Sequence, residues 1–374
     1  MRKLITEYSE WIKVYKHLNQ EKIVAFDLEA NGMHAYPEHI CLLQFGTTED
    51  QFIVYPEALG NADELRDFFQ NEKIEKIFHS CDYDIRSLYR DYNVVVRNMF
   101  DTSIGAQFLG APQLGLANVL NRFHNLKIEK NSKIQKMDWG KRPLSEEELK
   151  YAADDVLYLI DLRNLLVKNL KKLNRVTWAE EETSRLTKVR FGENSSSENS
   201  FLKIKGVRLL QPDQLAILRE LSIFRERFAL KKNSPPYKII GNKTLLFLAA
   251  NPEANLDSIK GIGRWLLQRA RKDLADALHR GINAKPVLLP KLPRRPSWSN
   301  SANARLDVLK KWRSRKGAEL SLDPAILWPV ASLQRIARTP AILSEELSDD
   351  NNPDVRNWQK KLLAKELEIL VKTL

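Results

Sequence analysis

The sequence has few of the features that mark a secreted or membrane protein. It contains only two cysteines, Cys41 and Cys81, in 374 residues, too few for a disulfide scaffold or a thiolate zinc cluster. No apolar run approaches the roughly 18 residues that cross a bilayer, and the opening segment MRKLITEYSEWIK contains no apolar signal core. We therefore expect a cytoplasmic protein that has no membrane partner.

The overall composition is that of a globular protein with more than one domain. Hydrophobic residues make up 43% and charged residues 29% of the chain, which excludes disordered and fibrous classes. At about 100–200 residues per domain, the length indicates two or three domains. Because appended domains often take the place of a partner subunit, we expect a monomer.

Charge is divided unevenly between the two halves of the chain. Residues 1–200 contain 27 Lys and Arg against 31 Asp and Glu, whereas residues 201–374 contain 33 against 17. The first half therefore has a net charge of −4 and the second half +16. A basic half of this kind suits a polyanion such as a nucleic acid, although a solvated, lysine-rich helical surface has the same composition.

The first half alternates short apolar runs with helical patterns. The runs are rich in β-branched and aromatic residues and end at Asn, Gly, Pro or charged residues, as strands do. The predicted strands are Ile23–Phe26, Ile40–Phe45, Phe52–Tyr55, Lys76–His79 and Val94–Val96. One helix is predicted to begin at Ser145 and to continue to about residue 173, and another covers Thr177–Arg190. The pattern predicts an α/β domain with a mixed sheet flanked by helices.

The second half contains only helical patterns, divided by segments of linker composition. Phe191–Ser200 is rich in Ser, Asn and Glu, and Val287–Asn300 is rich in Pro. The predicted organisation is an α/β domain over 1–190, linkers over 191–205 and 287–300, and two all-α domains over 206–286 and 301–374. The two helical units have similar patterns, so they are either copies of one module or two ordinary bundles.

Three short motifs contain candidate catalytic residues. Asp27 and Glu29 are two apart in a strand and therefore share a face. Tyr151 and Asp155 are four apart in a helix and also share a face. Asp84 follows an apolar strand, near the start of a helix. Each motif also has an ordinary structural interpretation, because acids end surface strands, tyrosines pack in cores and aspartates cap helices.

Four carboxylates gathered at one point would require cations, because like charges repel strongly in a low dielectric. Ligand sets made only of oxygen favour Mg²⁺ or Mn²⁺ over zinc. Two such ions about 4 Å apart suit in-line displacement at phosphorus. The acids are therefore a candidate phosphoryl-transfer site if the fold brings them together.

The order of these motifs resembles a known family. DLE (Asp27–Glu29), FHSCDYDIRSL with Asp84, and YAADDV with Tyr151 and Asp155 are similar to the three exonuclease motifs of the DEDDy superfamily. The segment KMDWGKRPLSEEELKYAADDV resembles one in ribonuclease D proteins, and LRELSIFRERFALKKNSPPYKIIGNKTLLFLA resembles an HRDC domain. The second helical unit is similar to HRDC but more diverged. The resemblance covers nearly the whole chain in the right order.

The resemblance implies an RNase H-like catalytic domain followed by two HRDC-like domains. Carried over by position, Asp27, Glu29, Asp84 and Asp155 would bind two divalent ions, Mg²⁺ or Mn²⁺. Tyr151 would hold the attacking water and help to deprotonate it. The implied activity is hydrolysis of RNA from the 3′ end to nucleoside 5′-monophosphates, with tRNA precursors or other small structured RNAs as substrates. A DNA 3′–5′ exonuclease and a non-catalytic nucleic-acid-binding protein are the alternatives.

Basic residues of the second half are candidates for contact with the nucleic acid. A carboxylate-lined site repels phosphates, so a separate basic surface would hold the strand. The candidates are Lys231, Lys232, Arg269, Arg271, Lys272, Arg294 and Arg295.

Five further residues near the motifs have mainly structural interpretations. His79 is expected to be a hydrogen-bonded core histidine, and Asp101 a cap for the helix that follows it. Trp139 and Arg142 are expected to support the helix of Tyr151. Gln44, on an apolar strand, either contacts the terminal nucleotide or satisfies a backbone group.

Overall fold

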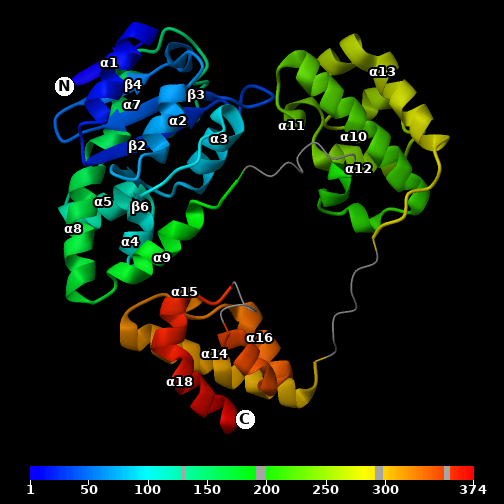
Figure 1. Cartoon of the computed structure of the whole chain (residues 1–374). Helices are drawn as coiled ribbons and strands as arrows, with labels where there is room; N and C mark the ends of the chain where they lie inside the picture. The colour runs from blue at the N-terminus through cyan, green and yellow to red at the C-terminus, as the bar shows by residue number, and fades with distance from the viewer. Residues whose placement is uncertain (129–130, 191–198, 291–297, 349–353) are drawn as a thin grey trace.

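The computed structural model describes residues 1–128, 131–190, 199–290, 298–348 and 354–374. The candidates Arg294 and Arg295, and most of the two predicted linkers, lie outside the described residues. Three bodies follow one another along the chain, an α/β domain and two helical domains (Figure 1). In the described part of the chain, no helix combines the length and the hydropathy that a membrane span requires.

The α/β domain is built on one six-stranded mixed sheet in the order β1-β4-β3-β2-β5-β6. The strands are β1 (Arg2–Ile5), β2 (Ile23–Ala30), β3 (Ile40–Gly46), β4 (Gln51–Val54), β5 (Glu75–Phe78) and β6 (Met99–Asp101). The central strands β2, β3 and β4 form an antiparallel meander, and the outer pairs are parallel. The predicted mixed sheet flanked by helices is confirmed.

The prediction was wrong about two strands. Val94 and Val96 are buried in the core just after a helix ends, but they belong to no strand. The strand in this part of the chain is β6, which begins at Met99. β1 was not predicted, because its exposed residues lack an apolar alternation. Its parallel pairing with β4 supplies the interactions that its own sequence does not indicate.

Helices cover both faces of the sheet. They are α1 (Tyr8–Leu18), α2 (Asp63–Gln70), α3 (Asp82–Tyr92), α4 (Thr102–Phe108), α5 (Leu116–His124), α6 (Ser132–Gln135), α7 (Glu146–Leu157), α8 (Leu159–Lys172) and α9 (Val176–Leu186), with a 3₁₀ turn at Pro56–Leu59. One core joins α1, α2 and α3 to the β2 residues Val24, Phe26 and Leu28. α7 and α8 pack on the other side of β2. The sheet is therefore a middle layer between two layers of helices.

The predicted long helix that begins at Ser145 is two helices. Its start was predicted correctly, because Ser145 and Glu148 form a capping box. The helix ends at Tyr158, whose φ of −105° and ψ of 0° depart from α-helical geometry, and α8 begins directly afterwards. The apolar periodicity continues through the break, so periodicity alone did not reveal it.

The two helical domains begin with the same order of elements. The first contains α10 (Pro212–Lys232), α11 (Pro236–Ile239), α12 (Asn242–Ala250) and α13 (Arg264–Ile282). The second contains α14 (Asn300–Leu320), α15 (Pro324–Leu327), α16 (Val330–Arg338), α17 (Leu343–Leu347) and α18 (Asn357–Lys372). The first three helices have 21, 4 and 9 residues in both domains. This agreement favours copies of one module over two unrelated bundles.

Two segments assigned to linkers belong in part to the core of the first helical domain. Phe201 and Ile204 are buried in that core, and Val287 and Leu289 pack against it. The predicted linkers included these apolar residues because the segments beside them have the composition of a linker.

The second helical domain shares a hydrophobic core with the α/β domain. Trp358, at the start of α18, stacks on Trp178 of α9 with ring centroids 4.7 Å apart, and it meets Phe108 edge-on at 5.2 Å. The Glu181 carboxylate accepts the backbone N–H groups of Asn357 and Trp358 at 2.7 and 3.1 Å. Glu181 thus caps α18 across the domain boundary, where the helix dipole favours a negative charge.

Candidate active site

β2 directs Asp27 and Glu29 to the side of the sheet that α7 covers. Val24, Phe26 and Leu28 fill the opposite core, and side chains alternate along a strand. The two acids therefore project together from the other face, as predicted. α7 contacts β2 and β3 on this side.

Asp84 lies in the first turn of α3 and is only 7% exposed. The turn before it is held by Asp101, whose carboxylate accepts the backbone N–H groups of Ser80 and Cys81, each at 3.0 Å. The same carboxylate accepts the Ser103 N–H at 2.8 Å and caps α4. Asp101 therefore fixes the start of α3 relative to β6, and the predicted cap is confirmed.

Tyr151 and Asp155 lie on α7, the helix that covers the acids of β2. Trp139 is 1% exposed and packs against the Tyr151 ring at 6.1 Å between centroids. Arg142 donates to the Cys41 carbonyl oxygen and to the Trp139 carbonyl oxygen, both at 2.7 Å. The support predicted for Trp139 and Arg142 is what the structure shows.

The electrostatics of the five side chains couple them to one another. Burial raises the pKa of Glu29 to about 10, and the charges of Asp27, Asp155 and Asp84 act in the same direction. Burial raises the pKa of Asp27 to about 7. The pKa values of Asp84 and Asp155 are raised well above the ordinary range, by burial first and by the charge of Asp27 second. The fold therefore brings acids that are up to 128 positions apart into one electrostatic site.

Tyr151 belongs to the same site. Burial raises its pKa, and the charges of Asp155, Glu29 and Asp27 raise it further. The phenol therefore retains its proton at neutral pH.

The donor set fits hard divalent cations. Within the described ranges, no three His, Cys, Asp or Glu side chains are grouped tightly enough to hold a metal ion. The four carboxylates nevertheless supply only oxygen, the ligand type that Mg²⁺ and Mn²⁺ prefer. Burial first, and the neighbouring carboxylates second, raise the pKa values of Glu29, Asp84 and Asp155, as expected for acids that are close to one another in a low dielectric.

Comparison with known proteins finds similarity along the chain. The profile of a 3′–5′ exonuclease family matches residues 3–171, and the profile of the HRDC domain matches residues 214–278. The ribonuclease D of Bartonella henselae is 27% identical over 380 aligned residues, covering 100% of this chain and 90% of the relative. The ribonuclease D of Nitrobacter hamburgensis is 27% identical, covering 96% and 93%. The chain is therefore similar along its length to ribonuclease D, with a match to a 3′–5′ exonuclease family followed by a match to the HRDC domain.

Solved structures show the ribonuclease D fold along the whole chain. The Escherichia coli RNase D structure has a TM-score of 0.73 at 19% identity and covers 100% of this chain and 99% of that one. A Bifidobacterium adolescentis protein has a TM-score of 0.80 at 20% identity and covers 99% and 96%. The fold class predicted from the sequence, an RNase H-like domain followed by helical HRDC-like domains, is confirmed.

His79 has a structural position beside the candidate site. Its ring nitrogens form hydrogen bonds with Thr102 Oγ1 at 2.8 Å and with the Leu114 carbonyl oxygen at 2.7 Å. The expectation of a hydrogen-bonded core histidine is met.

A loop next to the acids connects the α/β domain to the first helical domain, and sequence reasoning missed it. This β2–β3 loop, residues 31–39, begins two residues after Glu29. Tyr36 donates its backbone N–H to Asn233 Oδ1 at 3.0 Å and its hydroxyl to Glu226, and it packs on the core of that domain. Tyr237 donates to the Met33 carbonyl oxygen at 3.3 Å. No spacing rule in the loop indicated this contact.

The basic candidates of the first helical domain are all exposed. Arg271 forms an ion pair with Asp257 of its own domain, so part of its charge is already neutralised. Lys231 and Lys232 occupy the last turn of α10, directly before Asn233. Since Asn233 binds the β2–β3 loop, these two lysines lie at the edge of the domain that faces the catalytic domain.

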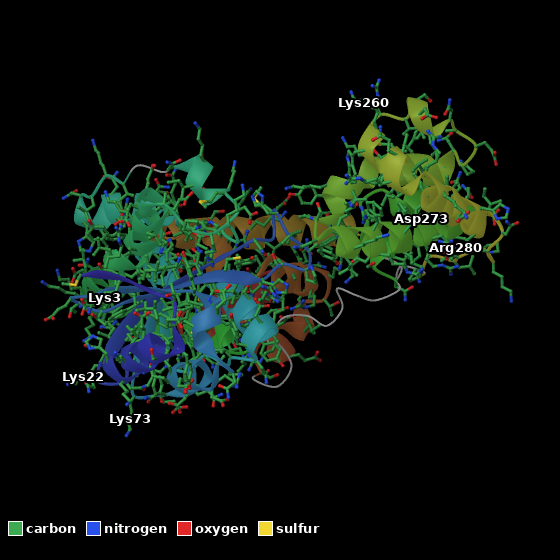
Figure 2. All side chains as sticks on the ribbon, turned by 90° about the horizontal axis from the view of Figure 1, so that it is seen from above. Lys3, Lys22, Lys73, Lys260, Asp273 and Arg280 are labelled. Carbon is green, nitrogen blue, oxygen red and sulfur yellow. The ribbon has the colours of Figure 1, made fainter. Side chains whose placement is uncertain are left out.

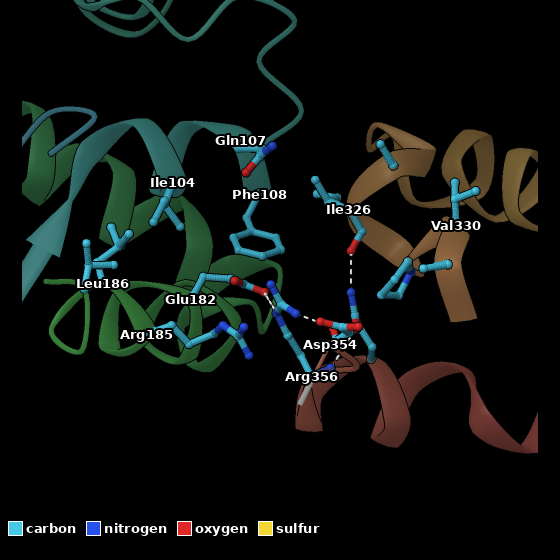
Figure 3. Close-up of a pocket in the computed structure, with 15 residues that line it drawn as sticks. Ile104, Gln107, Phe108, Glu182, Arg185, Leu186, Ile326, Val330, Asp354 and Arg356 are labelled. Atoms are coloured by element: carbon cyan, nitrogen blue, oxygen red, sulfur yellow. Dashed lines mark hydrogen bonds and ion pairs between the residues drawn. The ribbon is translucent and has the colours of Figure 1, made fainter. Parts of the chain in front are cut away.

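A cavity of about 750 Å³ lies between the α/β domain and the second helical domain (Figure 3). It is lined by α4 and α9 on one side and by α15, α16 and α18 on the other. Arg356 donates to Glu182 at 2.8 Å within it. None of the five candidate catalytic residues lines this cavity, so it is part of the domain seam.

Proposed function

We propose that this protein hydrolyses RNA from the 3′ end, one nucleotide at a time, and releases nucleoside 5′-monophosphates. The observation that carries the proposal is the placement of Asp27 and Glu29 on the face of β2 that α7 covers, with Tyr151 and Asp155 on α7 itself and the buried Asp84 in the first turn of α3. Small structured RNAs with a free 3′ end, tRNA precursors among them, are the proposed substrates.

Two divalent ions, Mg²⁺ or Mn²⁺, are proposed to bind the four carboxylates. When bound, such ions activate water for attack and stabilise the leaving 3′ oxygen. Asp27 and Glu29 would hold them from the sheet, and Asp84 and Asp155 from the two helices. Burial in a low dielectric increases the attraction of these carboxylates for a cation.

Tyr151 is proposed to hold the attacking water by hydrogen bonding. Its raised pKa makes the phenol a poor base at neutral pH. The O–H is therefore a donor that orients the water or the scissile phosphate oxygen. Packing of the Trp139 ring against the Tyr151 ring fixes that direction.

The first helical domain is proposed to hold the RNA beside the site. The β2–β3 loop binds this domain through Tyr36. Lys231, Lys232, Arg269 and Lys272 are exposed on it and would contact phosphates of the incoming strand.

Incubation of end-labelled RNA with Mg²⁺ and then with chelator tests the proposed function. A 5′-labelled strand should shorten stepwise, whereas a 3′-labelled strand should release its label as a mononucleotide at once. Chelator should stop both reactions. A matched deoxyribo-oligomer tests the preference for RNA. Release of internal fragments, or equal hydrolysis with chelator present, would contradict the proposal.

Replacing Lys231 and Lys232 together by alanine is expected to weaken RNA binding. Each lost phosphate contact should reduce the slope of log K against log salt by about 0.7 on a single strand. KM should therefore rise at moderate salt, whereas kcat should stay near the parent value. Steady-state kinetics between low and moderate salt measure both effects.

The Lys22→Ala/Lys73→Ala double variant is the matched control. It removes the same charge from the α/β domain, on the side away from the first helical domain, as Figure 2 shows. An equal loss of salt dependence in both double variants would show that the effect is one of net charge and would refute a specific contact at the end of α10.

A further inference from the structure

Gln44 is a polar residue in the middle of a fully buried strand. All seven residues of β3 are buried, and Gln44 is 0% exposed. Among the residues that the structure describes, neither the Nε2 nor the Oε1 atom of Gln44 has a hydrogen-bond partner. Buried amides that lack a partner are rare because each costs free energy, so this one requires an explanation.

The register of the sheet places Gln44 next to a catalytic carboxylate. Gln44 pairs directly with Asp27 on β2 and with Ile53 on β4. Directly opposed residues in an antiparallel pair have Cβ atoms about 4.5–5.5 Å apart on one face. The side chains of Gln44 and Asp27 are therefore neighbours on the face that α7 covers.

Apolar residues lie near Gln44. Ile53, its direct partner on β4, belongs with Leu42 and Ala152 to one buried cluster, against which Tyr151 packs. α7 lies so close to the sheet that a Cβ on Gly46 would be 3.1 Å from the Val156 carbonyl oxygen. Asp27 is thus the neighbouring side chain on the adjacent strand that can accept a hydrogen bond.

Neither interpretation offered by the sequence fits this position. A side chain with no exposed surface beneath α7 does not reach the terminal nucleotide. A side chain whose amide atoms have no partner does not satisfy a backbone group. Any role of Gln44 in the site is therefore exerted through Asp27.

We propose that Gln44 is a positioning residue for Asp27, to which its side-chain amide donates a hydrogen bond when that carboxylate holds a divalent cation. The inference rests on the proposed function. A glutamine amide has two N–H donors, and a carboxylate has lone pairs left for an amide when one oxygen binds a metal. Partners of this kind fix the orientation of metal ligands, and their loss typically lowers metal affinity or activity about 10–100-fold.

The test compares Gln44→Met with the parent in the full-length protein. Methionine has a similar length and no amide. We expect kcat on a labelled single-stranded RNA to fall about 10–100-fold and the affinity for Mn²⁺, measured calorimetrically without RNA, to fall in the same range. KM for RNA should not change. The metal-free melting temperature should stay level or rise, because an unpartnered polar group leaves the core.

Ile53→Met is the matched control, since it changes packing on the other side of Gln44 without touching a polar atom. Gln44→Leu is a second apolar variant, which keeps the test valid if Gln44→Met does not fold. Parent-like Mn²⁺ affinity and kcat in the folded Gln44 variants would overturn the inference. So would a rise in KM alone, or equal losses in Ile53→Met. If the parent protein itself neither bound Mn²⁺ nor hydrolysed RNA, the proposed function would be wrong. Results on the Gln44 variants alone would contradict only the role of Gln44.

Discussion

Replacing Asp155 by asparagine is expected to lower kcat on the order of 10³-fold or more. The change removes one of the four carboxylates proposed to hold the divalent ions, and the loss of a single preorganised electrostatic group in an active site already costs about 10²–10³-fold. The folded state should persist, because asparagine has the same shape. Single-turnover hydrolysis of a labelled RNA measures the loss.

The same carboxylates should make the metal-free protein less stable as the pH rises. Burial raises the pKa of Asp27 to about 7 from its ordinary value near 4. The folded state therefore binds this proton more tightly than the unfolded state, and the stability so gained is lost between about pH 4 and 7. Asp27→Asn should remove that loss and raise the metal-free melting temperature at pH 7.5, where each kcal/mol is worth about 2–4 °C.

Asp154→Asn provides the control for the measurement of hydrolysis. Asp154 lies next to Asp155 on α7 and outside the proposed ligand set, and its charge raises the pKa of Asp155 less than burial and Asp27 do. Activity near the parent value is expected for it. Parent-like hydrolysis by Asp155→Asn, or equal losses in Asp154→Asn, would remove the proposed site.

Replacing Trp358 by alanine is expected to cost about 3–5 kcal/mol of unfolding free energy, in the range for large aromatic side chains in a core. Trp358 is 3% exposed and packs between Trp178 and Phe108 of the α/β domain. Its loss leaves a cavity at the seam and weakens docking of the second helical domain. Chemical unfolding and limited proteolysis measure the two effects.

Ile369→Ala on the same helix is the control, because Ile369 is 59% exposed. Exposed substitutions of this kind usually stay within about 0.5 kcal/mol. If Trp358→Ala behaved like Ile369→Ala, the shared core would contribute nothing to stability. A truncation after Ser200 would remove both helical domains. Because of the shared core, it would expose Trp178 and Phe108 as well as remove a basic surface.

Local rules account for the parts of the candidate site that the sequence indicated. Alternation along β2 places Asp27 and Glu29 together, and the helical repeat places Tyr151 and Asp155 together. The capping box at Ser145 and the cap at Asp101 act within a few residues of themselves. Such rules depend on backbone geometry, which is the same in every protein.

The errors came from interactions between distant segments. Val94–Val96 has the composition of a strand, yet its side chains fill the core beside α3. β1 lacks that composition, yet it pairs with β4. The sequence around the helix break at Tyr158 contains no Gly or Pro that would predict it. In each case the conformation depends on which surface the segment meets.

The sequence alone was sufficient to identify the motifs, their order along the chain, the sorting of charge and the fold class, since spacing and composition are local properties. The packed fold was needed to show that α7 covers the face of β2 that carries Asp27 and Glu29, that Tyr36 binds the first helical domain, and that Trp358 joins the second to α9. It also placed Gln44 opposite Asp27. The physical reason is that burial, register and docking depend on contacts between residues far apart in the chain. The chemistry of a single tyrosine or glutamine does not indicate which distant residue it will contact.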